Sequence, residues 1–305
     1  MDGILCLDKP QDKPQDITSF GCCAVVRRLM KEKKIGHAGT LDPMATGVLP
    51  LLLGKATRAL SLLPRHDKRY TAVLRFGLTS DTEDIWGKVT AIGGSLPSRE
   101  QIEEALPLFR GEIRQTPPMM SAVKQGGVRL YELARQGKEV ERESRTVTVY
   151  SLNAVEYREE TGELTLDCHC SQGTYIRTLC SELGKRLGCG AVMTDLRRTM
   201  AAGFELSCCV TLQEAERLAE QGELASRLLP VETVFADLPL VTVTAAQAVR
   251  FGNGGALSLD RLRVPVLSDV RVRSPEGEFL GLGRPEEGQL KVLRLFARER
   301  GKENV

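Results

Sequence analysis

Residues 36–50 read GHAGTLDPMATGVLP, and no other stretch of this sequence says more about structure and chemistry. Its three glycines free the backbone for turns and for close approach to a partner, so we predict a loop here. Asp42 precedes Pro43, and a residue before proline is biased away from helix, which stiffens the presentation of its carboxylate. A purely structural alternative is that Asp42 caps a helix with Pro43 at its first position.

The flanking sequence on the N-terminal side predicts a strand, a loop and a helix. Residues 3–7 form a short apolar run, followed by the unit Lys-Pro-Gln-Asp at 9–12 and again at 13–16. Because prolines interrupt regular structure, this tandem repeat indicates an extended loop. Thr18 is a suitable cap for a helix that ends in the basic cluster at 27–34.

Periodicity along the rest of the chain predicts both sheet and helix. The predicted strands are 70–76, 146–150 and 163–171, the predicted helices are 96–109 with Ser98 as cap and a helix between Gly173 and Gly188, and the segment 115–127 is predicted as loop. Beyond about residue 237, short strands at 239–243, 264–272, 278–283 and 290–295 and helical turns at 245–251 indicate a small β-barrel-like module.

Composition places few limits on function. The 305 residues carry a net charge of +2, 42% are hydrophobic and 27% are charged, as in ordinary globular proteins of about two domains. The small net charge neither marks nor excludes a nucleic-acid binder. We find neither an export signal nor an apolar run long enough for a membrane span, and therefore expect a soluble, cytoplasmic protein without membrane contact.

The nine cysteines are expected to be reduced thiols in the cytosol. A zinc site built from Cys168, His169 and Cys170 with Cys180 or Cys189 is the alternative, but the spacing differs from that of a zinc knuckle. Since Cys168 and Cys170 alternate with His169 along a predicted strand, buried thiols on one strand face are favoured and no metal is expected.

The segment 36–50 fills every fixed position of the pattern G-H-x-G-x-L-D-P-x-A-x-G-x-L-P, the catalytic motif of the bacterial TruB family of tRNA pseudouridine(55) synthases. Further segments resemble that family in the same order along the chain. They are 3–19 apart from the repeat, 67–70, 76–87, 115–124, 129–132, 173–179 and 196–204.

The resemblance implies an α+β pseudouridine synthase fold, with a mainly antiparallel mixed sheet flanked by helices, in residues 1–236. A thumb-like insert at about 119–145 would clamp the T-stem loop, and residues 237–305 would form a PUA-like RNA-binding β-barrel. The implied reaction flips a T-loop uridine out of tRNA, breaks its C1′–N1 bond and joins C5 to C1′. Nothing is oxidised and no group is added, so no cofactor is expected. A monomer with tRNA as its partner and no obligate protein partner is expected.

Site residues follow from the same motifs. Asp42 would be the catalytic carboxylate, acting as nucleophile or as base, and Arg177 would pair with it and lower its pKa. Tyr70 would stack on the target base and is a candidate for removing the C5 proton. Tyr175 and Leu196 would line the uracil pocket, and His37 would insert beside the flipped nucleotide. Phosphates would be contacted by Lys9 or Lys13, Arg58, Lys68, Lys124 and Arg129.

Plainer interpretations remain for single residues: core packing for Tyr70, Tyr175 and Leu196, and solvated charge for Arg177 and the lysines. The repeat at 9–16 departs from the family pattern and leaves it open whether Lys9 or Lys13 lies near the site. Met120 stands where the family often has an aromatic residue. An RNA-binding or tRNA-folding chaperone with secondary or lost synthase activity is the alternative function, and a carboxylate-driven nucleoside hydrolase is a third.

Overall fold

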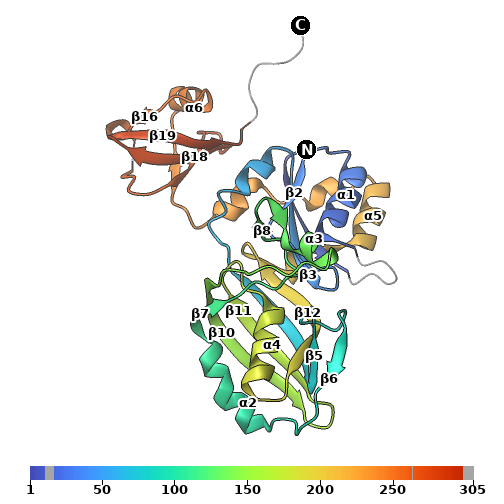
Figure 1. Ribbon diagram of the computed structural model, residues 1–305. Helices are drawn as coiled ribbons and strands as arrows, with labels where there is room; N and C mark the ends of the chain where they lie inside the picture. Colours follow the sequence, from blue (N-terminus) through green and yellow to red (C-terminus); the bar gives the residue numbers. More distant parts are fainter. Residues whose placement is uncertain (11–16, 263, 298–305) are drawn as a thin grey trace.

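A computed structural model describes residues 1–10, 17–262 and 264–297. Its largest element is a ten-stranded sheet whose main path runs β14-β1-β3-β12-β4-β11-β10-β7 (Figure 1). The strands of this sheet are β1 (Gly3–Lys9), β2 (Ile35–His37), β3 (Thr46–Leu53), β4 (Lys68–Phe76), β7 (Gly111–Gln115), β10 (Arg145–Arg158), β11 (Glu163–Cys170), β12 (Ala191–Ala201), β13 (Phe204–Glu205) and β14 (Val210–Thr211). Only the β1–β14 and β3–β12 pairs are parallel, which confirms a mainly antiparallel mixed sheet.

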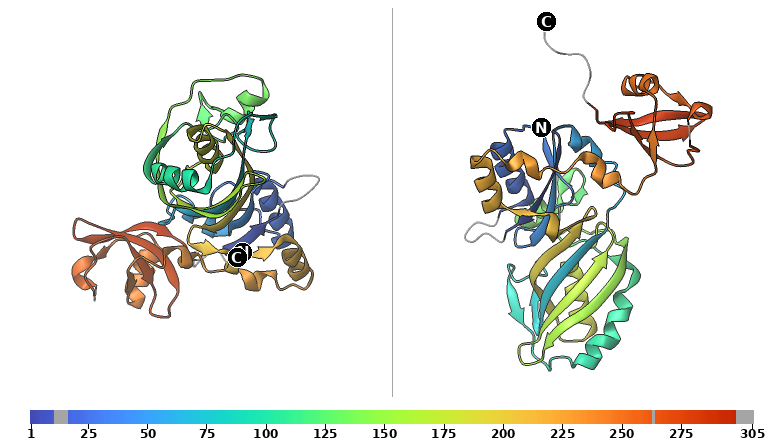
Figure 2. Two further views of the ribbon diagram at one scale, coloured as in Figure 1. Left: turned by 90° about the horizontal axis from the view of Figure 1, so that it is seen from below. Right: turned by 180° about the vertical axis from the view of Figure 1, so that it is seen from behind.

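Helices flank this sheet, and two short hairpins lie beside it (Figures 1 and 2). The α-helices are α1 (Ser19–Met30), α2 (Arg99–Ala105), α3 (Leu130–Arg135), α4 (Ile176–Arg186), α5 (Leu212–Glu220) and α6 (Ala245–Gly252). The 3-10 helices are η1 (Gly54–Ala59), η2 (Leu106–Phe109), η3 (Leu206–Cys208), η4 (Leu224–Arg227), η5 (Val231–Phe235) and η6 (Leu259–Arg261). The hairpins are β5 (Leu78–Ser80) with β6 (Val89–Ala91), and β8 (Lys124–Gln125) with β9 (Val128–Arg129).

The helix starts follow the predicted capping residues. Thr18 caps α1 by accepting a hydrogen bond from the Gly21 amide at 2.9 Å. Ser98 forms a reciprocal capping box with Gln101 at the start of α2. Both caps satisfy amides that the first helical turn leaves without partners.

The main core lies between the sheet and the helices. Alternate residues of β4, from Tyr70 to Phe76, join one buried cluster with residues of α1 and α4. Cys168 and Cys170 of β11 belong to the same cluster and are fully buried, which confirms the prediction of buried thiols on one strand face.

A second, five-stranded sheet follows residue 239 and has a core of its own. Its order is β15 (Leu240–Thr242), β17 (Val270–Arg273), β18 (Phe279–Glu286), β19 (Gln289–Leu295) and β16 (Leu257–Ser258). Phe279 and Phe296 pack on Phe235 of η5, with ring centroids 6.4 and 5.8 Å from the Phe235 ring. The small C-terminal sheet has the curled form expected of a PUA-like module (Figure 2).

Several local predictions were wrong. Residues 46–50 are not loop but the start of the buried strand β3. The prediction missed this strand because a strand covered on both faces shows a continuous apolar run without the alternation that marks a half-buried one. Asp42 caps no helix, since a turn follows it. The strand predicted from 264 begins only at Val270, consistent with Pro265, which cannot donate to a strand ladder. Residues 124–125, in the predicted loop, pair with 128–129 just beyond it in a hairpin.

Gly47 provides a test of how tightly the segment 36–50 is packed. Its φ is +100°, and a Cβ atom there would lie 2.1 Å from the Arg198 carbonyl oxygen. We expect Gly47→Ala to lower the free energy of unfolding by about 2–4 kcal/mol in urea titrations, since it adds a clash to backbone strain. Gly222→Ala is the matched control, with φ +75° but open space around it, and should cost about 1 kcal/mol. Equal losses would contradict the packing explanation.

Candidate active site

Asp42 lies in a tight turn between β2 and β3 that is fastened from two sides. The Ser19 hydroxyl accepts a hydrogen bond from the Leu41 amide at 2.8 Å and donates to the Leu41 carbonyl at 3.1 Å. On the other side, the Lys9 ammonium donates to the carbonyl oxygens of Pro43 and Ala45, both at 2.7 Å. The backbone on both sides of the carboxylate is therefore fixed.

This position of Lys9 corrects the expectation that it contacts phosphate. The side chain is fully buried, and its ammonium donates hydrogen bonds to the turn that carries Asp42, so it is not available to an RNA backbone. Lys13, the alternative, lies outside the described residues.

Arg177 meets the Asp42 carboxylate from the start of α4, as predicted. Its Nε lies 3.0 Å from Asp42 Oδ2, and its Nη2 donates to Asp42 Oδ1 at 3.3 Å. The remaining contacts of the guanidinium are Nη1 with the Thr82 carbonyl at 3.1 Å and Asp84 Oδ2 at 3.4 Å, and Nη2 with the Met120 carbonyl at 2.8 Å. Four of these contacts are hydrogen bonds from Nη1 and Nη2, and the contact between Nε and Asp42 Oδ2 is an ion pair, so each nitrogen of the guanidinium faces a protein oxygen. With 4% of the side chain exposed, its orientation is fixed.

The pKa of Asp42 is raised, although Arg177 acts in the predicted direction. Burial is the largest cause, Arg177 and then Lys9 lower the pKa, and the neighbouring Asp84 carboxylate raises it. About a third of the Asp42 side chain, 36%, is still exposed, so the carboxylate remains open on one side to a substrate. A guanidinium shared between two carboxylates cannot fully offset the burial of one of them.

Tyr70 is buried on β4 directly opposite Arg198 of β12. Burial raises the pKa of its phenol to about 12 against the lowering effect of Arg198, so the phenol is neutral near pH 7. Arg198 is itself fully buried and donates to the carbonyl oxygens of Gly39, Thr40 and Val48 at 3.1, 3.3 and 2.8 Å. It thereby ties the segment 36–50 to β12.

The other predicted pocket residues lie around this centre. Leu196 is buried in the same cluster as Tyr70, Leu41 and Met44. Tyr175 is the N-cap residue of α4, two positions before Arg177. His37 ends β2, and burial followed by the charge of Arg198 lowers the pKa of its imidazole, which favours the neutral ring.

The predicted phosphate-binding residues are spread more widely. Lys68 starts β4, and burial and Arg198 lower the pKa of its ammonium. Lys124 and Arg129 face each other as an exposed pair in the β8–β9 hairpin. Arg58 is exposed on η1 and its Nη1 donates to the Leu295 carbonyl of β19 at 3.4 Å, so it lies at the contact with the C-terminal sheet.

Comparison with known proteins identifies the family of this chain. The model of the TruB family pseudouridylate synthase N-terminal domain matches residues 27–176. The tRNA pseudouridylate synthase B C-terminal domain matches 177–236, and a further TruB C-terminal domain of pseudouridine synthase II matches 239–296. The chain belongs to the TruB family.

Relatives of the TruB family match almost the whole chain. A tRNA pseudouridine synthase B of Dechloromonas aromatica is 44% identical over 95% of this chain and 93% of its own length. One of Geobacillus thermodenitrificans is 41% identical over 97% of this chain and 100% of its own length. Among solved structures, a Cbf5–Nop10–Gar1 complex matches at 26% identity and a TM-score of 0.71, covering 97% of this chain and 85% of the other. These matches confirm the fold class and the family that the motifs indicate.

Two residues of this TruB-family site, Arg198 and Asp84, were not assigned a role from sequence alone. Arg198 and Asp84 lie inside motifs that the resemblance had marked, at 196–204 and 76–87, yet neither motif indicates what its charged side chain contacts. Asp84 accepts hydrogen bonds from the Thr82 hydroxyl at 2.7 Å and the Trp86 amide at 3.0 Å, besides its contact with Arg177. Only the three-dimensional structure identifies these partners.

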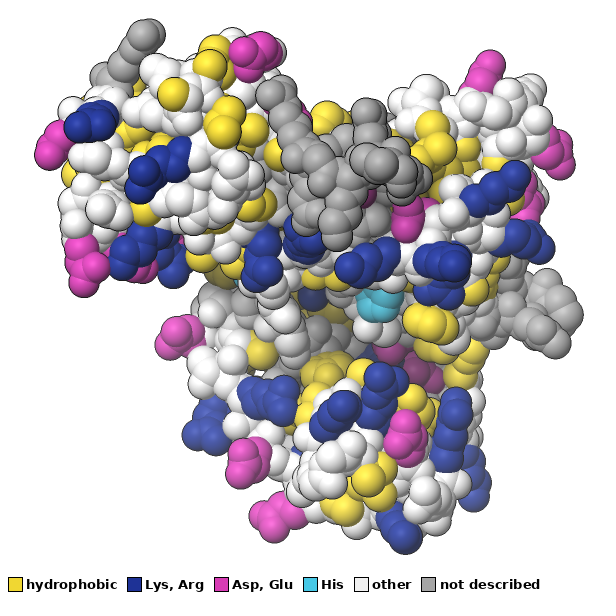
Figure 3. Space-filling model, turned by 90° about the horizontal axis from the view of Figure 1, so that it is seen from above, with side chains coloured by type: hydrophobic (Ala, Val, Ile, Leu, Met, Phe, Trp, Pro, Cys, Tyr) yellow, Lys and Arg dark blue, Asp and Glu magenta, His cyan; other side chains and the backbone are white. Residues whose placement is uncertain are grey.

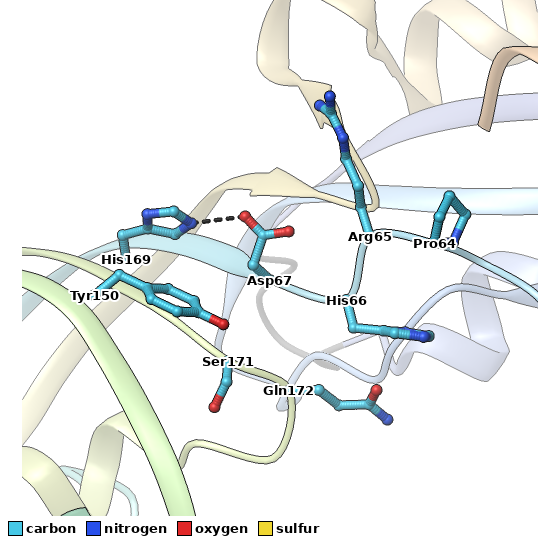
Figure 4. A pocket seen from close by; sticks show the side chains of 8 residues that line it. All are labelled: Pro64, Arg65, His66, Asp67, Tyr150, His169, Ser171 and Gln172. Carbon is cyan, nitrogen blue, oxygen red and sulfur yellow. Dashed lines mark hydrogen bonds and ion pairs between the residues drawn. The ribbon is translucent and has the colours of Figure 1, made fainter. Parts of the chain in front are cut away.

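A cavity of about 620 Å³, which Asp42 does not line, lies against β10 and β11 (Figure 4). It is lined by Pro64, Arg65, His66, Asp67, Tyr150, His169, Ser171 and Gln172. Its charged groups already have protein partners, since Asp67 bonds the His169 ring at 2.7 Å and Arg65 bonds Asp237 at 2.7 Å. The cavity therefore presents no charged group that requires a ligand.

No helix in the described parts of the chain is long and apolar enough to cross a membrane. Among the same residues, no group of three or more His, Cys, Asp or Glu side chains is arranged to hold a metal ion.

The Asp42–Arg177–Asp84 arrangement predicts a specific pH dependence. If Asp42 acts as an anion, the rate of pseudouridine formation falls as the pH drops through its raised pKa, above the usual 3.9 or so for aspartate. Asp84→Asn removes a group that raises this pKa and frees Arg177 for Asp42. The acid limb of the single-turnover rate should therefore shift to lower pH.

Asp81→Asn is the matched control for this experiment. Asp81 lies in the same acidic turn and accepts a hydrogen bond from the Lys88 amide at 2.8 Å. It is not one of the residues that accept hydrogen bonds from the Arg177 guanidinium. A shift of the acid limb to higher pH in Asp84→Asn, or an equal shift in both variants, would refute the coupling.

Proposed function

We propose that this protein converts a uridine in the T-loop of tRNA into pseudouridine, with Asp42 as the catalytic carboxylate. The observation that carries the proposal is a partly exposed carboxylate held in two contacts by a buried arginine, in the segment that defines the family. Full-length relatives named tRNA pseudouridine synthase B support tRNA as the substrate. The same relatives favour a synthase over a protein that only binds or folds RNA.

We assign a part in the reaction to each group of the site. Asp42, as nucleophile or as base, lies against the ribose and base of the flipped uridine while the C1′–N1 bond breaks, and C5 then bonds to C1′. The C5 proton leaves and N1 gains a proton, so the product is an isomer and no cofactor takes part. Arg177 orients the carboxylate. Tyr70, as a neutral phenol, stacks on the base, and Tyr175 and Leu196 line the pocket.

RNA binding would use surfaces around this centre. We assign residues 1–236 to the catalytic domain, the insert at 119–145 to a clamp on the T-stem loop, and 237–305 to a PUA-like RNA-binding domain. The family models that end at 236 and begin at 239 support that boundary. Basic side chains border a hollow on one face of the molecule (Figure 3). His37 would enter the space left by the flipped base, and Arg58, Lys68, Lys124 and Arg129 would contact phosphates.

We further propose that the protein works in the cytoplasm as a monomer without an obligate protein partner. An isomerisation needs neither a second substrate nor a redox partner. Each group to which the reaction assigns a role comes from this one chain, which supports action by the chain alone.

Tritium release from uridine labelled at C5 tests the proposed reaction directly. We expect the wild-type chain to release tritium from a tRNA transcript and Asp42→Asn to be slower by about 10³-fold or more, since the amide can serve neither as nucleophile nor as base. Dissociation constants for tRNA should differ less than about threefold, because phosphate contacts supply most of the affinity. Asp269→Asn, which changes a half-buried aspartate paired with Arg284 beside the C-terminal sheet, should behave as wild type.

No release by folded wild-type protein would end the proposal. Release of free uracil instead, detected by chromatography, would indicate a nucleoside hydrolase.

The hairpin pair Lys124 and Arg129 tests the clamp. If both contact phosphate, the double variant Lys124→Ala/Arg129→Ala should bind tRNA more weakly, and the slope of log affinity against log salt should become shallower by about two. Arg158→Ala is the control, because this exposed arginine is already paired with Glu156 at 2.9 Å. An unchanged slope in the double variant would place the RNA elsewhere.

A further inference from the structure

Gln115 stands at the root of the insert and is almost fully buried, with 1% of its surface exposed. It is the last residue of β7, and its side-chain amide meets the backbone of Tyr175 at two points. Gln115 Oε1 accepts a hydrogen bond from the Tyr175 amide at 2.9 Å, and Gln115 Nε2 donates to the Tyr175 carbonyl at 3.1 Å. One primary amide thus satisfies both backbone groups of a residue 60 positions away.

The position of Tyr175 at the start of α4 makes this contact structurally important. It is the N-cap residue of α4, and its side chain makes no cap hydrogen bond. Its carbonyl also accepts from the Leu179 amide at 3.1 Å, in the first turn of α4. The Gln115 amide therefore fixes the point at which α4 begins, two residues before Arg177.

The same segment touches Arg177 a second time. Five residues after Gln115, the Met120 carbonyl accepts a hydrogen bond from Arg177 Nη2 at 2.8 Å. Between these contacts, the Pro117 carbonyl accepts from Arg142 Nη1 at 3.0 Å, which ties the two ends of the insert together. The root of the insert is thus attached both to the helix start and to the guanidinium that holds Asp42.

We propose that Gln115 is a positioning residue for the pseudouridine reaction, which acts through Tyr175 to place Arg177 against Asp42. This inference rests on the proposed function. Gln115 itself touches neither the carboxylate nor the guanidinium in any contact described above. Because a misplacement of about 1 Å can cost a catalyst about 10²-fold, a loosened helix start should appear in the rate of the chemical step more than in RNA binding.

The principal variant is Gln115→Leu, which keeps approximate volume and removes both hydrogen bonds. We expect the single-turnover rate on tRNA to fall about 10- to 100-fold, with the dissociation constant for tRNA changed less than about threefold. Tyr157→Phe is the matched control, because the Tyr157 hydroxyl also donates to a backbone carbonyl, that of Pro97 at 2.7 Å, and Tyr157 has no assigned role at the site or in RNA binding. It should retain wild-type rates.

Gln115→Glu gives a readout that a general loss of stability would not imitate. A protonated carboxyl can accept from the Tyr175 amide and donate to the Tyr175 carbonyl, as the native amide does, whereas the carboxylate cannot donate. Burial favours the protonated form. The rate of this variant relative to wild type at the same pH should therefore rise as the pH is lowered.

Hydrogen exchange of the Tyr175 amide in the full chain tests the contact without any activity measurement. Exchange should be faster in Gln115→Leu than in wild type and unchanged in Tyr157→Phe. If wild type formed no pseudouridine, this measurement would still decide the contact, and the failure would belong to the proposed function. The inference is overturned if Gln115→Leu keeps the wild-type rate, if its loss lies only in tRNA affinity, or if Gln115→Glu shows the same relative rate at every pH.

Discussion

The contact between Asp42 and Arg177 is the constraint on which the rest of the site depends. It joins a turn near the N-terminus to a helix start 135 residues later, and each nitrogen of the guanidinium contacts a protein oxygen. Burial of such a pair is costly unless every remaining hydrogen-bonding group is satisfied. The Thr82 and Met120 carbonyls and the Asp84 carboxylate meet that condition here.

The same constraint explains why so many buried charges surround the site. Lys9 and Arg198 are fully buried, and both donate to backbone carbonyls of the segment 36–50. An irregular turn leaves carbonyl groups without strand or helix partners, and long cationic side chains can reach them. These two residues thus stabilise the backbone so that a single carboxylate can remain open.

The resemblance to the TruB family indicated the turn around Asp42, the Arg177 partner and the mainly antiparallel sheet, whereas alternation along the chain indicated only individual strands. The sequence did not indicate that residues 46–53 form a central strand, since an apolar run with glycine and proline has no alternation. Lys9 was misassigned for a related reason. A lysine beside a proline in a loop gives no sign that its ammonium will be buried against carbonyls 34 and 36 positions away.

The direction in which the Asp42 pKa is shifted also could not be predicted from local sequence patterns. An arginine partner implies a lowered pKa, but the outcome depends on how much water the fold excludes and on a second carboxylate at Asp84. Gln115 is a comparable case, because its segment matched the family motif while its partner, the Tyr175 backbone, became visible only in three dimensions.

The place of β12 in the sheet has a consequence for synthesis on the ribosome. This strand, residues Ala191–Ala201, lies between β3 and β4, both made from the first quarter of the chain. Until β12 has left the exit tunnel, no strand links β3 to β4, and Arg198 cannot reach the turn around Asp42. A nascent chain must therefore carry an incomplete sheet for most of its translation, and it gains its carboxylate site only when about two thirds of the protein has emerged.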